Sequence, residues 1–233
     1  MIIKPACHRA AFVLTVSEYS RGEILNWSKA DEHKVVNVGN GVGAPFTLSG
    51  PKQDPGYPYL LYVGSHKVHK NLPRLLKAFA ISGVGKSIRL LMTGEPDAQM
   101  LQDVETLDLA SCVKFLGSPN NDQLSAYYRG ALALLFPSLY EGFGLPPVEA
   151  MACGIPVLTS NVCALPEIVG DAGIIVDPLQ TEEIANGIRR LVDDSSLVAD
   201  LRRRGLARAS QFTWEKTAEK TFAALESAMP VTK

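Results

Sequence analysis

Residues 131–160 read ALALLFPSLYEGFGLPPVEAMACGIPVLTS, which is two apolar runs separated by a turn and a short helical pattern. Both runs, residues 131–138 and 155–160, are apolar at consecutive positions, as strands buried on both faces are. The two prolines between them can only begin a helix, and Gly154 can end it. The stretch therefore predicts a strand–helix–strand unit of a parallel sheet.

The same unit recurs along the chain. From Tyr59 onward, apolar runs alternate with helical patterns, at residues 59–64, 88–94, 112–117, 131–138, 155–160 and 173–177. Since strands of this kind need helices on both faces, we predict an α/β fold with a doubly wound, six-stranded parallel Rossmann-like sheet over residues 59–212. Ahead of it, residues 36–58 are predicted to form a linker.

The composition limits the number of domains, the partners and the cellular location that we expect for this protein. The 233 residues are 46% apolar and 20% charged, with a formal net charge of -1, which fits one large globular domain plus a fragment of another and gives no reason to expect nucleic acid as a partner. Four scattered cysteines indicate reduced thiols and a cytoplasmic location. Peripheral association with the inner face of the membrane is left open.

Ligands of doubly wound sheets bind outside the carboxyl ends of the strands. The first of these ends is followed by SHKVHKN, where Lys70 and Asn71 lie at the start of a helix and suit a phosphate group. The alternative is a solvated basic loop. Gly94 and Gly117 end the next two runs. The fingerprints of dinucleotide dehydrogenases and of P-loop NTPases do not occur, which argues against both classes.

Two glutamates follow the fourth run. Glu141 lies in a turn in which Gly142 and Gly144 let the backbone approach a ligand closely. The two prolines are predicted to place Glu149 in the first turn of the next helix, where the alternative role is to offset the helix dipole. Carboxylates at this edge suit sugar hydroxyls, and free N–H groups in the glycine turn suit a diphosphate.

Residues 137–160 resemble the signature of retaining glycosyltransferases of family 4, in the GT-B fold class, where two glutamates separated by seven residues flank Gly-Phe-Gly. Further segments occur in the order of that family: VSEYSRGEIL (16–25), NGV (40–42), YVGSHKVHKNL (62–72), VKFLG (113–117) and FTWEKTA (212–218). The resemblance runs from about Val13 to Leu225, nearly the whole chain.

The resemblance implies a UDP- or GDP-linked hexose as donor, with mannose favoured, and transfer with retained anomeric configuration in glycan or polysaccharide biosynthesis. It implies that Glu141 and Lys70 are catalytic, with Glu141 on the donor sugar and Lys70 on the diphosphate, and that Glu149 binds the ribose. Further donor-binding positions that it implies are Gly64, Ser65, Lys67, Asn71, Gly94, Leu116, Gly117, Ser118, Pro119, Gly142, Phe143, Gly144 and Leu145. Many family members carry an arginine at the position of Ser65, for which His66 or Lys67 are the candidate substitutes. Neither a cofactor nor a metal is implied.

A GT-B enzyme has two Rossmann-like domains with the active site between them. The resemblance implies that residues 1–35 are a remnant of the amino-terminal acceptor domain, a strand near residues 10–17 with a helix after it, and that residues 213–233 are a helix that crosses back to it. The acceptor, a glycan or lipid-linked sugar, would then be bound by a domain outside this chain or on a partner chain. A non-catalytic nucleotide-sugar-binding module is the alternative. We expect residues 10–29 to dock onto a second copy or a partner, or to be poorly ordered.

Overall fold

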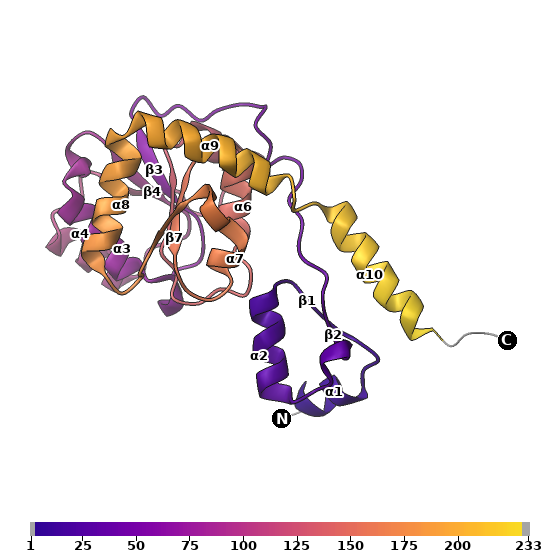
Figure 1. Ribbon diagram of the computed structural model, residues 1–233. Helices are drawn as coiled ribbons and strands as arrows, with labels where there is room; N and C mark the ends of the chain where they lie inside the picture. Colours follow the sequence, from indigo (N-terminus) through magenta and orange to yellow (C-terminus); the bar gives the residue numbers. More distant parts are fainter. Residues whose placement is uncertain (1–2, 230–233) are drawn as a thin grey trace.

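The computed structural model describes residues 3–229 and divides them between a large α/β domain and a small amino-terminal unit (Figure 1). The first two residues of the expected remnant and the last four of the expected crossing helix lie outside the described residues.

The large domain is built on one parallel sheet with the strand order β5-β4-β3-β6-β7-β8. Its strands are β3 (Tyr59–Tyr62), β4 (Arg89–Met92), β5 (Val113–Phe115), β6 (Leu134–Phe136), β7 (Val157–Ser160) and β8 (Ile174–Val176). Each strand lies within a run that the sequence analysis predicted, so the prediction of a six-stranded parallel sheet is confirmed. The order of the strands reverses between β3 and β6, which makes the gap between their carboxyl ends the switch point of the sheet.

The central strands are apolar throughout because helices cover both of their faces. Consecutive side chains of a strand point to opposite faces. Leu60 and Leu61 of β3 are therefore packed in different layers of the core, and both are 0% exposed. Every residue of β6 and β7 is buried as well.

One layer of helices lies on each face of the sheet. The layer on the side of Leu60 is formed by α3 (Leu72–Ser82), α4 (Ala98–Thr106) and α8 (Thr181–Asp193). The layer on the side of Leu61 is formed by α5 (Asn121–Gly130), α6 (Leu145–Ala152) and α7 (Leu165–Val169). The long helix α9 (Ser195–Ala209) runs along one edge of the domain and contributes to both layers (Figure 1).

The amino-terminal unit consists of α1 (Ile3–Arg9), β1 (Val13–Thr15), α2 (Glu18–Ser28) and β2 (Val35–Asn37), with β1 and β2 paired in parallel. β1 and α2 fall where the sequence predicted a strand and a helix, whereas α1 was not predicted. β2 lies across the predicted boundary between remnant and linker. Leu14 and Trp27 remain exposed on this unit, and docking through residues 10–29 stays a prediction.

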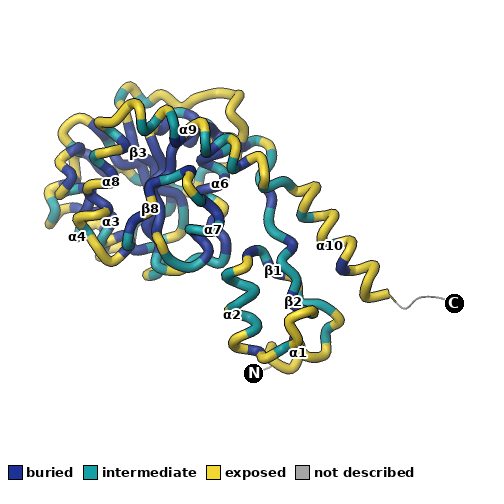
Figure 2. Tube along the Cα trace, in the orientation of Figure 1, coloured by how far each residue is buried: buried dark blue, intermediate teal, exposed yellow. Residues whose placement is uncertain are grey.

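Helix α10 (Trp214–Ala228) leaves the large domain on the side of the amino-terminal unit (Figure 1). Of its residues only Ala224 is buried, and Figure 2 shows exposed positions along most of its length. Large apolar side chains are among them, at Trp214, Phe222 and Leu225. The role of this helix as a crossing element is likewise still a prediction.

Candidate functional site

The loops that follow β3 and β6 meet at the switch point of the sheet. The first contains the short 3-10 turn η2 (Val68–Lys70). The second leads from β6 to α6 and is tied to the first by a hydrogen bond of 2.7 Å from the Leu139 N–H to the His69 carbonyl. A further bond, 3.3 Å from the Ala164 N–H to the Glu141 carbonyl, joins the second loop to the segment after β7. Both loops are thus held in place by backbone contacts.

Lys70 and Glu141 form an ion pair between these two loops, with 2.5 Å between Lys70 Nζ and Glu141 Oε1. Their side chains are only 13% and 14% exposed, so water screens the pair weakly. Lys70 Nζ also lies 5.0 Å from the centre of the Phe136 ring. The sequence predicted both residues for the site, and the structure brings their charges into direct contact.

Gly64 makes room for the Tyr62 hydroxyl beside this pair. Its φ of +151° is one that glycine adopts readily, and a Cβ there would lie 2.7 Å from the Tyr62 hydroxyl and 3.7 Å from Lys70 Cε. Tyr62 donates a hydrogen bond of 2.8 Å to the Ser65 carbonyl. Burial raises the pKa of Tyr62, and the nearby charge of Glu141 raises it further, so this phenol remains a neutral donor.

A cavity of about 510 Å³ opens beside Gly64, across the ends of β3, β4 and β5. Its walls include six of the predicted positions: Gly64, Ser65, Gly94, Gly117, Ser118 and Pro119. The Gly94 N–H donates to the Gly117 carbonyl at 2.7 Å and closes the floor between two strand ends. Leu116 lies next to this floor and donates its N–H to the Met92 carbonyl. These positions, which are scattered in sequence, therefore surround one space.

His66 also lines this cavity and was considered in the sequence only as a substitute for arginine. Its Nε2 lies 2.8 Å from the Thr93 carbonyl, which requires the Nε2–H tautomer or the charged ring. Its Nδ1 is buried and has no hydrogen-bond partner among the described residues. A Cβ at Gly94 would come within 2.8 Å of the ring. His66, rather than Ser65, therefore fills the space beside the strand end.

Two more of the predicted positions belong to a different cavity. Lys67 and Asn71 line a second cavity of about 540 Å³, next to α3 and α4. The Asn71 side chain is buried and donates to the Pro137 and Pro178 carbonyls at 3.0 and 2.8 Å. Its side chain therefore holds the loop after β6 to the loop after β8, and its amide donors are already used. The exposed side chain of Lys67 is free to reach a ligand.

The glycine turn is bounded by buried side chains. Phe143 is 7% exposed and lies edge-on to Phe212, with 5.7 Å between ring centres. Gly144 has φ +108°, and a Cβ there would lie 2.8 Å from Leu165 Cδ2, so this position requires glycine. Leu145, the first residue of α6, is 37% exposed at the mouth of the turn.

Glu149 does not lie in the first turn of its helix, so that prediction is wrong. α6 begins at Leu145, which places the glutamate in the second turn. The Glu149 carboxylate accepts a hydrogen bond of 2.9 Å from the hydroxyl of Tyr128, a residue on α5 that is 0% exposed. Burial raises the pKa of Glu149, and the Tyr128 hydrogen bond partly opposes this. A role in offsetting the helix dipole does not explain such a contact.

The sequence analysis missed Tyr62, Thr93 and Tyr128. Each is an aromatic or hydroxyl residue inside a strand, at its end or in an amphipathic helix, where such residues usually serve the core. Their contacts link segments far apart in sequence, and no local pattern marks them.

Within residues 3–229, no group of three or more histidine, cysteine or acidic side chains could hold a metal ion. In the same range, none of the helices combines the length and the apolar character that crossing a membrane requires.

Residues 49–208 match the family model described as glycosyl transferases group 1. The sequence is 34% identical over 226 residues to O-antigen chain mannosyltransferase B of Escherichia coli, covering 91% of this chain and 59% of that protein. It is 31% identical over 224 residues to an MMP alpha-(1->4)-mannosyltransferase of Mycolicibacterium hassiacum, covering 93% and 54%. The chain thus spans less than two thirds of the length of either relative.

Two solved structures extend the comparison to the fold. Sucrose-phosphate synthase from Thermosynechococcus elongatus superimposes with a TM-score of 0.84 at 28% identity, over 98% of this chain and 62% of that chain. Anabaena Alr3699/HepE, solved in complex with UDP and glucose, gives a TM-score of 0.85 at 21% identity, over 97% and 66%. Both superpositions cover nearly the whole chain, so they extend beyond the six-stranded sheet to the small unit ahead of it and the helix after it.

Proposed function

The chain belongs to the glycosyl transferases group 1 family, and we propose on that premise that it is the donor-binding half of a retaining hexosyltransferase of family 4. It binds a hexose linked to GDP or UDP, and the hexose is passed to an acceptor hydroxyl in polysaccharide biosynthesis. Mannose is favoured because two relatives are named mannosyltransferases. The acceptor, a glycan or lipid-linked sugar, is bound by a domain outside these residues or on a partner chain.

The Lys70–Glu141 pair carries this proposal. The two charges compensate each other 2.5 Å apart at the switch point of the sheet. A nucleotide-diphosphate sugar offers each of them a new partner: phosphate oxygens for the ammonium group and sugar hydroxyls for the carboxylate. The two residues therefore bracket the bond between sugar and phosphate. The neighbouring cavity of about 510 Å³ has room for the nucleotide.

In this arrangement the base lies against Gly117, Ser118 and Pro119, and the ribose hydroxyls donate to Glu149. Backbone N–H groups of the glycine turn complement the charge of Lys70 on the phosphates. Fixed donors of this kind stabilise charge that develops in the transition state.

The transfer step breaks the bond between the anomeric carbon and the diphosphate oxygen, and the electron pair stays on that oxygen. Lys70 stabilises the negative charge that results. The acceptor hydroxyl attacks the oxocarbenium-like sugar on the face from which the diphosphate leaves, and its proton passes to the leaving oxygen. Attack on the same face retains the anomeric configuration.

Calorimetric titration with GDP-mannose, UDP-glucose, GDP and UDP tests the proposal. One of the two nucleotide sugars should bind more tightly than its nucleotide alone, and Glu141→Ala should abolish that difference while the nucleotide still binds. Binding of none of the four compounds would contradict the proposal.

A non-catalytic nucleotide-sugar-binding module is the second candidate, because an ion pair such as Lys70–Glu141 can hold a nucleotide sugar without transferring it. Slow hydrolysis of the donor in the absence of acceptor, lost in Lys70→Ala, separates the enzyme from the module.

We further propose a cytoplasmic location, which the free cysteines at positions 7, 112, 153 and 163 support. Peripheral contact with the inner membrane face is part of the same proposal.

A further inference from the structure

The first turn of α2 is bonded to the glycine turn of the candidate site. Ser17 Oγ and Ser20 Oγ both donate to the Gly142 carbonyl, at 2.6 and 2.8 Å. The contacts span 125 and 122 positions of sequence and join the amino-terminal unit to the large domain. Ser17 is fully buried, so no water competes for its hydrogen bond.

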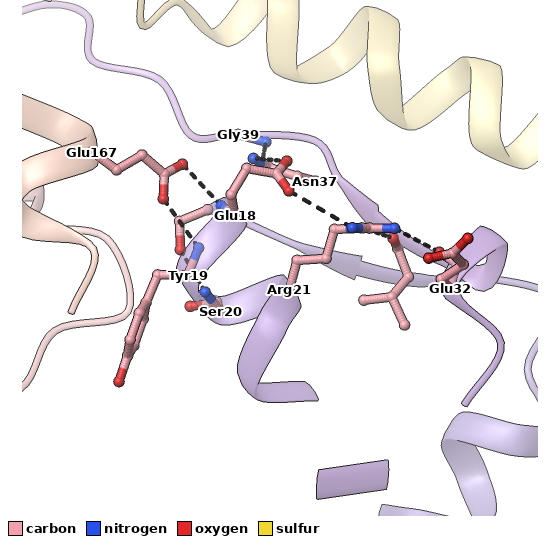
Figure 3. Close-up of polar contacts among 10 residues, drawn as sticks. Glu18, Tyr19, Ser20, Arg21, Glu32, Asn37, Gly39 and Glu167 are labelled. Atoms are coloured by element: carbon pink, nitrogen blue, oxygen red, sulfur yellow. Dashed lines mark hydrogen bonds and ion pairs between the residues drawn. The ribbon is translucent and has the colours of Figure 1, made fainter. Parts of the chain in front are cut away.

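A second contact fixes the same turn of α2. The carboxylate of Glu167, at the start of α7, accepts the N–H of Glu18 at 2.8 Å and of Tyr19 at 3.0 Å (Figure 3). Ser17 also caps the helix by accepting the Ser20 N–H. Three N–H groups that a helix N-terminus leaves free are thereby satisfied, two of them by the large domain. These contacts fix the position and rotation of α2. They therefore also fix the direction in which its serine hydroxyls point.

Gly142 contributes space to this contact rather than unusual backbone angles. It is not among the glycines with positive φ. A Cβ at this position would lie 3.2 Å from Ser20 Oγ, a tight contact that would push the hydroxyl back by a few tenths of an ångström. The absence of a side chain thus allows the contact with α2.

The two hydrogen bonds set the plane of one peptide group. In a trans peptide the C=O of one residue and the N–H of the next point in opposite directions. With the Gly142 carbonyl held against α2, the Phe143 N–H points away from α2. Among the hydrogen bonds that residues 3–229 make with one another, none uses this N–H. This N–H is therefore available to a ligand, two positions along the chain from Glu141.

We propose that Ser17 and Ser20 are positioning residues for the hexose part of the donor. They hold the peptide between Gly142 and Phe143 so that the Phe143 N–H and the Glu141 carboxylate offer one donor and one acceptor to neighbouring sugar hydroxyls. The inference rests on the proposed function. It makes sugar recognition depend on where the amino-terminal unit sits.

Ser20→Ala tests this, because it removes one of the two bonds to Gly142 and leaves the Ser17 cap intact. Ser20→Thr keeps the hydroxyl, and Glu23→Ala is the control at an exposed position of the same helix. Each variant of the full chain is titrated with GDP and GDP-mannose, and with UDP and UDP-glucose. Ser20→Ala should lower the gain in affinity due to the sugar about fivefold and leave nucleotide affinity unchanged. Ser20→Thr should restore the gain, and Glu23→Ala should match the parent chain.

A second readout does not depend on the ligand. The amide resonance of Phe143 in a nitrogen–proton NMR spectrum should shift in Ser20→Ala, because its own peptide carbonyl loses a hydrogen bond. An unmoved resonance, or equal losses of affinity for nucleotide and nucleotide sugar, would overturn the inference. If the parent chain binds none of the four compounds, the proposed function fails and the assignment of a sugar ligand fails with it. The Phe143 resonance then still decides whether the serines position the peptide.

Discussion

Lys70 Nζ and Glu141 Oε1 lie 2.5 Å apart, although 71 positions of sequence separate the two residues. The lysine follows β3 and the glutamate follows β6, so the contact bridges the point at which the strand order reverses. Each charge is the only close opposite charge recorded for the other among the described residues. A change at either position therefore alters both the free state and the ligand-bound state.

Lys70→Ala and Glu141→Ala should differ in which ligand they affect. Loss of the ammonium group should weaken the nucleotide and the nucleotide sugar alike, by about 2 kcal/mol or roughly thirtyfold, as expected for hydrogen bonds to a charged group. Glu141→Ala should weaken only the nucleotide sugar. Parallel calorimetric titrations give both values. Equal effects of the two substitutions on the free nucleotide would contradict the assigned roles.

The raised pKa of Glu149 predicts a pH dependence of stability. Between the ordinary value of 4.5 and the raised value, the folded chain binds more protons at Glu149 than the unfolded chain does. The contribution of Glu149 to the free energy of unfolding should therefore fall as pH rises through that window. Denaturant titrations across the window measure this, and in Glu149→Gln the Glu149 contribution should vanish.

Tyr128→Phe should extend that window to higher pH. The Tyr128 hydroxyl is the hydrogen bond that lowers the Glu149 pKa, so its loss lets burial raise the pKa further. The midpoint of pH-dependent nucleotide binding should rise with it. Tyr127→Phe is the matched control, because it alters the adjacent tyrosine of the same helix, which does not contact Glu149. An unchanged midpoint in Tyr128→Phe would show that the hydroxyl does not act on Glu149.

Gly94→Ala should have a larger effect on the protein than the strain of its backbone angle alone explains, because it should also reduce nucleotide affinity. Gly94 has φ +93°, and a new Cβ would lie 2.8 Å from His66 Nε2, whereas Gly83 has φ +74° and nothing within 4 Å. Both substitutions should lower the free energy of unfolding by roughly 1 kcal/mol, because alanine disfavours a left-handed backbone. Only Gly94→Ala should also displace His66 and weaken nucleotide binding, by about tenfold. Melting curves and titrations of the two variants separate these effects, and equal nucleotide affinities would show that the His66 ring does not shape the nucleotide site.

Arg129 is expected to be a stability determinant rather than a site residue. Its guanidinium group is buried and donates to the carbonyls of Pro45, Thr47 and Pro51, at 3.0, 3.2 and 2.7 Å. Arg129→Met leaves these carbonyls without their donor and should lower the free energy of unfolding by about 3 kcal/mol or more. Arg202→Met, at an exposed position, should change it by no more than about 0.5 kcal/mol. Chemical denaturation of both variants provides the comparison.

The sequence revealed the sheet because strands buried on both faces leave an unmistakable apolar signal, as at Leu60 and Leu61. It also placed Lys70 and Glu141 at strand ends, which meet at one edge of any parallel sheet. It misplaced Glu149, because the two prolines were expected to begin the helix. They occupy instead the second and third positions of a first turn that begins at Leu145.

Contacts between distant segments could not be read from the sequence. The hydroxyl of Tyr128 meets Glu149 only because α5 packs beside α6, and Ser20 meets Gly142 only because α2 docks on the turn. Helix α1 was missed for a related reason: with seven residues, one of them proline, it has little helix preference of its own. The two contacts and helix α1 all depend on tertiary packing, which no local sequence pattern reveals.

The order of the strands also governs when the site can come into existence during folding. β3, β4 and β5 come from residues 59–115 and β6, β7 and β8 from residues 134–176, and the two halves meet where Leu61 pairs with Leu134. Pairing within each half joins near neighbours in sequence, whereas the seam between the halves closes a long loop, which slows its formation. Lys70 belongs to one half and Glu141 to the other. A chain that has folded only one half holds an unpaired charge, and the ability to bind a nucleotide sugar should emerge only with the last step, the closing of the seam.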